Sequence, residues 1–145
     1  MPLLDLEAQY RPLRAEILAA VTRVCDSQRF IMGPEVEALE RELAQYVGVP
    51  EAITVSSGTD ALLAALMALG IGPGDEVITT AFSWISTSAM ITHAGATVVF
   101  ADTDGATFTI DPAAIEAAIT PRTVGIIPVH LYGQCADMKA IRKIA

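Results

Sequence analysis

The sequence predicts an α/β fold of three layers, in which a mostly parallel sheet carries helices on both faces. Short apolar runs, typical of buried strands, alternate along the chain with segments of helical periodicity, and this order indicates right-handed βαβ crossovers. Apolar residues make up 52% of the 145 residues and charged residues only 18%, which suits a globular domain with a core.

The first third of the chain predicts two helices. Apolar side chains recur at helical spacing between residues 7 and 26. Pro12 fits a first turn better than a helix interior, so we expect the regular helix to begin near it. Residues 27–33 break the pattern. Pro34, followed by acidic residues, then opens a second helix with an apolar stripe of its own.

After Pro50 the strand-like runs begin. The expected strands span residues 52–55, 76–79, 97–101 and 124–129, and the expected helices span residues 61–69, 83–93, 112–119 and 138 onward. The helix over 61–69 is almost wholly apolar, so we expect it to be deeply buried. The chain stops inside its last helix while the sheet is still open, and we expect it to be a fragment of a longer protein.

The turn Ser56–Asp60, between the first expected strand and its helix, is the leading candidate for ligand binding. A helix N-terminus presents unpaired N–H groups and the positive end of the helix dipole to an anion. Gly58 would let an anion approach the backbone closely, and Ser57 and Thr59 carry hydroxyl donors. The same residue types form ordinary N-caps, and the turn matches neither common glycine-rich nucleotide pattern. Phosphate binding and simple capping are therefore both open on the pattern alone.

Three further residue types bear on function. The only tryptophan, Trp84, follows the second expected strand, at the sheet edge where ligands bind; it could stack on an aromatic cofactor or belong to a core or an interface. His130 follows the fourth expected strand and could act as an acid or base or simply shape its loop. The only lysines, Lys139 and Lys143, are expected on the solvated surface.

The bulk properties exclude several classes of function. A formal net charge of -8 argues against a nucleic-acid or anionic-membrane surface. Cys25 and Cys135 show no metal-ligand spacing and suggest no disulfide framework, so no metal is expected. The sequence has neither a signal-peptide pattern nor an uninterrupted apolar stretch of about 18 residues. We therefore expect a cytoplasmic protein.

Six motifs lie in order along essentially the whole chain. They are Leu4-Asp5-Leu6, Arg29–Val36, Ser57–Leu62, Gly72–Ile78, Ile119–Thr123 and Pro128–Gln134. Together they resemble the start of a fold-type I pyridoxal 5'-phosphate (PLP) enzyme and, more narrowly, the DegT/DnrJ/StrS family of sugar aminotransferases.

The resemblance implies an organisation and an activity. Residues 1–33 would form an N-terminal helical arm with a substrate loop, and residues 34–145 the N-terminal part of an incomplete PLP-binding large domain. Members of the family transfer an amino group, usually from glutamate, to a keto group of a nucleotide-linked sugar. They are homodimers with active sites at the subunit interface.

The resemblance also implies site residues. Those binding the cofactor, through its phosphate or by stacking on its ring, would be Ser57, Gly58, Thr59 and Trp84. Those near the sugar substrate would be Phe30, Met32 and Gly33. No catalytic residue is expected in this chain, because the lysine that joins the cofactor and the aspartate that pairs with its ring nitrogen would lie beyond residue 145.

Three alternatives are open. The parent could be a PLP-dependent sugar dehydratase of the same family, in which a histidine replaces the lysine. The chain could be a truncated, non-catalytic binding partner. A plain nucleotide-binding α/β domain would rest on analogy of fold alone.

Overall fold

The structure is a computed structural model that describes residues 4–145. The chain divides into two compact units, one ending at Thr54 and the other spanning Val55–Ala145. The functional division at residue 33 that the family resemblance implies stays a prediction.

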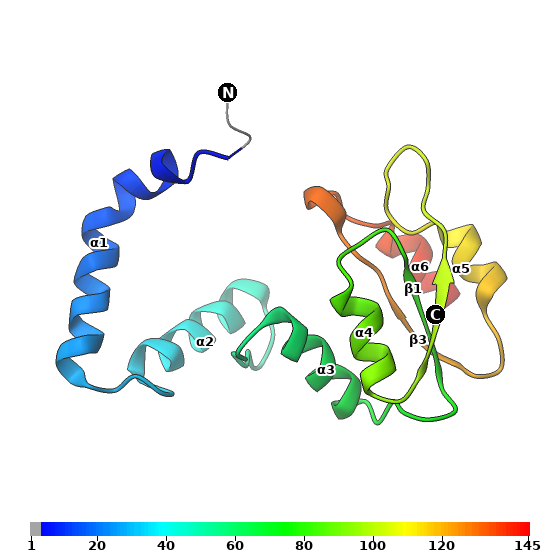
Figure 1. Cartoon of the computed structure of the whole chain (residues 1–145), viewed down its shortest axis with the longest axis horizontal. Coiled ribbons are helices and arrows are strands. Elements are labelled where there is room, and N and C mark those ends of the chain that lie inside the picture. Colours follow the sequence, from blue (N-terminus) through cyan, green and yellow to red (C-terminus); the bar gives the residue numbers. More distant parts are fainter. Residues whose placement is uncertain (1–3) are drawn as a thin grey trace. The chain divides into compact units, whose positions relative to one another are not determined.

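The N-terminal unit contains two helices, α1 (Leu6–Ser27) and α2 (Pro34–Val47) (Figure 1). The predicted start of α1 near Pro12 is wrong, because the helix begins at Leu6 and Pro12 lies inside it. The cause is a cap: Oδ1 of Asp5 accepts a hydrogen bond from the N–H of Ala8 at 2.9 Å. This cap lets the helix form ahead of Pro12, although the proline removes one helical hydrogen bond.

The C-terminal unit is built on a three-stranded parallel sheet of order β2-β1-β3 (Figure 1). Its strands are β1 (Glu76–Thr80), β2 (Thr97–Ala101) and β3 (Thr123–Ile127). All five residues of the central strand β1 are buried. These three strands lie where the sequence predicts them, to within two residues at each end.

Helices cover both faces of this sheet. The helices α3 (Gly58–Ala68) and α4 (Ser86–His93) share a core with one face, and α5 (Pro112–Ala118) and α6 (Met138–Ile144) share a core with the other. The first core contains Leu66, Val77, Ile91 and Ala96, and the second contains Ile78, Ala101, Ile110, Ile115, Ala136 and Ile141. A short 3-10 turn, Leu131–Gly133, follows β3. The three-layer α/β prediction is confirmed.

The predicted strand at residues 52–55 is wrong, because this segment has no regular secondary structure. Thr54 uses its donors locally: its N–H and its Oγ1 both donate to Oε1 of Glu40 on α2, at 2.8 Å each. Ile53 is 83% exposed, so the apolar run does not enter a sheet. A side-chain tether therefore replaces the ladder hydrogen bonds of a strand.

The predicted deep burial of the helix over 61–69 is also wrong. Only Leu66 of α3 is buried, while Met67 and Leu69 are 67% and 75% exposed. The helix packs against α4 and contributes Leu66 to the core on one face of the sheet. Its apolar composition therefore exceeds what this unit can bury.

The N-terminal end of β1 carries a buried carboxylate. The Glu76 side chain is 5% exposed, and its oxygens accept hydrogen bonds from Oγ1 of Thr120 and from Nη2 and, at 2.9 Å, Nε of Arg122. The bonds from Thr120 and then Arg122 lower the pKa of the Glu76 carboxyl below its ordinary value. This cluster fastens the loop before β3 to the central strand.

We predict that Glu76→Gln destabilises the protein at neutral pH, because it removes the charge that Arg122 and Thr120 stabilise. A lowered folded-state pKa stabilises the protein above the ordinary glutamate value of about 4.3, and this contribution is lost as the pH falls through the lowered pKa. The gap in unfolding free energy between wild type and variant should therefore shrink on acidification. Urea unfolding at a series of pH values measures it.

Glu116→Gln is the matched control, because Glu116 is exposed on α5 and has no ion pair among residues 4–145. This variant should unfold like the wild type at every pH. Equal stability of Glu76→Gln and wild type at neutral pH, or a gap that widens in acid, would contradict the assignment.

Candidate functional site

The N-terminus of α3 presents main-chain donors. Ser57 caps the helix: its Oγ accepts from the N–H of Asp60 at 3.1 Å and its carbonyl from the N–H of Ala61 at 3.0 Å. The N–H groups of Gly58 and Thr59 find no acceptor within residues 4–145. Two donors at the positive end of a helix dipole can bind an anion.

Gly58 leaves space beside these donors. It has no left-handed φ, and a Cβ built on it would meet no atom within 4 Å. Neither backbone conformation nor packing in the described structure therefore requires glycine at this position. The missing side chain lets an anion reach the main chain closely, which is the geometry that a phosphate group needs.

The serine hydroxyls of this turn are engaged with Asp60. Ser57 Oγ donates to Oδ2 of Asp60 at 2.8 Å, and Ser56 Oγ donates to the same oxygen. These bonds, that of Ser56 first, lower the pKa of the Asp60 carboxyl. The expectation that the Ser57 hydroxyl donates to a ligand is thus not met by this geometry, and the assignment of Ser57 as a phosphate-binding residue stays a prediction.

The hydroxyl of Thr59 is bonded to a residue that the sequence analysis missed. Thr59 Oγ1 donates to Oγ of Ser86 at 2.9 Å, and Ser86 is the first residue of α4. This contact joins the first turns of two helices that follow different segments of the chain. A hydroxyl residue opening the helix after the second predicted strand was the available signal.

Trp84 lies just after the central strand and two residues before Ser86. It is 77% exposed, so it does not belong to the core of this unit. The neighbouring Phe82 contacts Phe108, with ring centroids 6.1 Å apart and planes tilted by 42°. Through Ser86, the loop that carries Trp84 is tied to the N-terminus of α3, and a ring stacked on the indole would lie on that loop.

A hollow lies at the carboxyl edge of the sheet between β1 and β2. Its lining comes from the last residues of these strands and the loops after them: Thr80, Ala81, Phe82, Phe100, Ala101 and Asp102. The N–H of Phe82 donates to Oγ1 of Thr80 at 3.2 Å, which fixes the start of the loop. Ligands of open parallel sheets bind at this edge.

The remaining candidates of the C-terminal unit have structural surroundings. Nδ1 of His130 accepts a hydrogen bond from the N–H of Ala136 at 3.1 Å, which supports its loop-shaping role. Lys139 and Lys143 are exposed on α6, as predicted. Neither lysine has the desolvated surroundings that a nucleophilic amine requires.

The predicted substrate residues Phe30, Met32 and Gly33 belong to the N-terminal unit. Phe30 and Met32 are 61% and 62% exposed, and Met32 adopts a left-handed φ of 47°. Gly33 is buried and caps α2, and a Cβ on it would lie 2.6 Å from the carbonyl oxygen of Arg29. Packing alone thus explains this glycine, and the substrate role of the loop stays a prediction.

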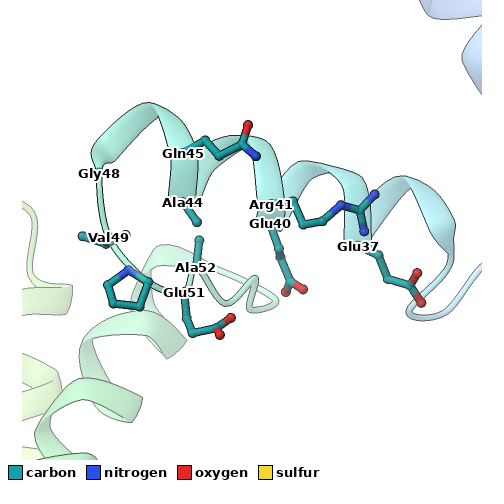
Figure 2. Close-up of a pocket in the computed structure, with 10 residues that line it drawn as sticks. Glu37, Glu40, Arg41, Ala44, Gln45, Gly48, Val49, Glu51 and Ala52 are labelled. Atoms are coloured by element: carbon teal, nitrogen blue, oxygen red, sulfur yellow. The ribbon is translucent and has the colours of Figure 1, made fainter.

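Figure 2 shows a hollow of the N-terminal unit, between α2 and the segment that follows it. Glu37, Glu40, Arg41 and Glu51 are among its lining residues. Hydrogen bonds from the N–H and then the hydroxyl of Thr54 lower the pKa of Glu40. Glu40 therefore anchors the segment that carries Thr54 to α2. In this hollow the carboxylate of Glu40 has a structural role.

Two other kinds of feature are absent from residues 4–145. No helix there is both long enough and apolar enough to span a bilayer. No group of three histidine, cysteine, aspartate or glutamate residues in this range is arranged to hold a metal ion.

The chain matches known proteins over its whole length. Residues 12–145 match the model of the DegT/DnrJ/EryC1/StrS aminotransferase family. UDP-N-acetyl-3-dehydro-alpha-D-glucosamine 3-aminotransferase of Acidithiobacillus ferrooxidans is 50% identical over 145 residues, which are 100% of this chain and 39% of the relative. The chain thus spans about two fifths of the length of such relatives.

Solved structures of similar sequence also match nearly the whole chain, and the chain again covers less than half of each. DesV of S. venezuelae, in complex with a ketimine intermediate, has a TM-score of 0.95 and 49% identity, over 99% of this chain and 39% of that one. NtdA of Bacillus subtilis with bound cofactor PMP has a TM-score of 0.93 and 41% identity, over 100% of this chain and 34% of that one.

Two glycines at helix N-termini should respond differently to alanine. Gly33→Ala forces a Cβ against a main-chain carbonyl that cannot move cheaply, so we expect a loss of about 1–3 kcal/mol in stability. Gly58→Ala meets open space and should leave stability unchanged or raise it by up to about 1 kcal/mol. Urea unfolding of both variants measures the difference, and equal losses would contradict the packing argument.

Proposed function

The chain belongs to the DegT/DnrJ/EryC1/StrS aminotransferase family, and on that premise we propose that the protein transfers an amino group to the keto group of a nucleotide-linked sugar, with PLP as cofactor and glutamate as amino donor. The observation that carries the proposal is the pair of unbonded N–H groups beside the open position of Gly58. Relatives named for amination of a UDP-linked keto sugar support the substrate class.

The residues present fit the phosphate of PLP. The N–H groups of Gly58 and Thr59 would donate to its oxygens, and a Cβ at Gly58 would occupy the space that those oxygens need. The family's dependence on this cofactor is evident from solved members in PMP and PLP forms. Bound PLP supplies an aldehyde that takes up the amino group and a ring that accepts electron density during transfer.

Trp84 would hold the ring of the cofactor. The exposed indole follows the carboxyl end of the central strand and lies two residues before Ser86 in the chain. Ser86 is hydrogen-bonded to Thr59, which belongs to the turn that would receive the phosphate. A flat apolar face there both fixes the ring plane and shields it from water. The N-terminus of α3 would thus hold the phosphate and the loop after β1 would hold the ring. Together they would orient the aldehyde of PLP without using a charged side chain of these residues.

We predict that the protein expressed from its complete reading frame moves ¹⁵N from labelled glutamate to a UDP-linked 3-keto sugar. Mass spectrometry of the sugar nucleotide should show the label only when PLP is present. Loss of water from the sugar without label transfer would favour the dehydratase, and the absence of both reactions on nucleotide-linked keto sugars would overturn the proposal.

We predict that Trp84→Ala weakens PLP binding about 3- to 10-fold, because a stacked aromatic pair contributes about 0.5–1.5 kcal/mol. Trp84→Phe, which keeps an aromatic face, is the matched control and should bind within about twofold of the wild type. Equilibrium dialysis against PLP measures both dissociation constants. Equal affinities of wild type and Trp84→Ala would remove the stacking role.

A further inference from the structure

The contact between Thr59 and Ser86 links the two helices that open toward the proposed cofactor. The residues lie 27 positions apart in the chain, and their hydroxyl oxygens are 2.9 Å from one another. Both side chains are half-buried, and α3 and α4 pack together on one face of the sheet. The contact therefore joins the first turns of two helices that pack against each other.

Two hydroxyls that share one hydrogen bond keep a single O–H free between them. If an anion accepts from Thr59, the hydrogen between the two oxygens must come from Ser86. If the anion accepts from Ser86, it comes from Thr59, as in the direction drawn in the structure. In either case both hydroxyls are needed to present one oriented donor, and each bond strengthens the other.

The other hydroxyls of this turn are directed elsewhere. Those of Ser56 and Ser57 both donate to the carboxylate of Asp60. Among the hydroxyl side chains of the Ser56–Asp60 turn, that of Thr59 donates outside the turn, to Oγ of Ser86. A hydroxyl has one hydrogen to donate, so Thr59 can donate to an anion beside Gly58 only when Ser86 turns its own O–H toward Thr59 and so orients it.

We propose that Ser86 is a positioning residue for the phosphate of PLP, acting through the hydroxyl of Thr59. This inference rests on the proposed cofactor site. It assigns a role to a residue that a motif centred on Gly58 does not include.

The test is a set of variants of the protein expressed from its complete reading frame, Ser86→Ala, Thr59→Val and the double variant, with Ser86→Thr as the hydroxyl-keeping control. Equilibrium dialysis gives the dissociation constants of PLP and of pyridoxal, which lacks the phosphate. Ser86→Ala should weaken PLP binding about 5- to 10-fold and leave pyridoxal binding unchanged, because only the phosphate uses the donor. Ser86→Thr should bind PLP like the wild type.

The double variant should bind PLP no more weakly than Thr59→Val, because the two hydroxyls act as one donor. Additive losses would show that the two hydroxyls act independently, and an equal loss for pyridoxal and PLP would show a merely structural role; either result overturns the inference. Wild-type binding of PLP by Ser86→Ala would overturn it too, while leaving amino transfer by the wild type intact. A wild type that binds PLP and fails to transfer ¹⁵N overturns the proposed reaction alone.

Discussion

The C-terminal unit depends on the complete burial of its central strand. β1 pairs with β2 on one edge and β3 on the other, and helices cover both of its faces, so all five of its residues are buried. A strand in this position can carry polar groups only where each finds a partner. The Thr79 hydroxyl accordingly donates to the carbonyl of Ile127 at 2.9 Å, and Glu76 is fully paired. Strain or slippage of β1 would displace both of its ends together.

The two ends of β1 have different tasks. At the amino end, Glu76 with Thr120 and Arg122 fastens the sheet, and none of these groups faces the carboxyl edge. At the carboxyl end, the chain leaves the core through Phe82 and Trp84, where side chains become exposed. Stability and ligand contact are thus separated along a single strand, which is the arrangement expected of open parallel sheets. The buried Glu76 cluster stabilises the amino end of β1, so the loop at the carboxyl end can expose the Trp84 indole without removing a core contact of the strand.

The sequence predicts an element well when the residues that cause it to form lie within or next to that element. The strands β1, β2 and β3 are short runs rich in valine, isoleucine and threonine, so their own residues indicate them. The helix at Pro112 is opened by the adjacent cap Asp111, whose Oδ1 accepts a hydrogen bond from the N–H of Ala113. The segment at 52–55 has the same apolar signal but is held by Glu40, from another helix. The role of Ser86 escaped for the same reason, since its partner lies 27 residues away. Hydrogen bonds between segments far apart in the chain determine these features, and the periodicity of a single segment does not reveal them.

The turn before α3 contains a carboxylate beside its proposed anion site, and the hydrogen bonds explain how both fit. Asp60 lies in the first turn of the helix, where a negative charge interacts favourably with the dipole. Two serine hydroxyls donate to it, and these bonds lower the pKa of its carboxyl. Its charge is therefore stabilised by the hydroxyls of Ser56 and Ser57. The donors left for a phosphate are the main-chain N–H groups of Gly58 and Thr59 and the one free O–H of the Thr59–Ser86 pair, so Asp60 stabilises the free helix end without occupying the groups that the anion needs.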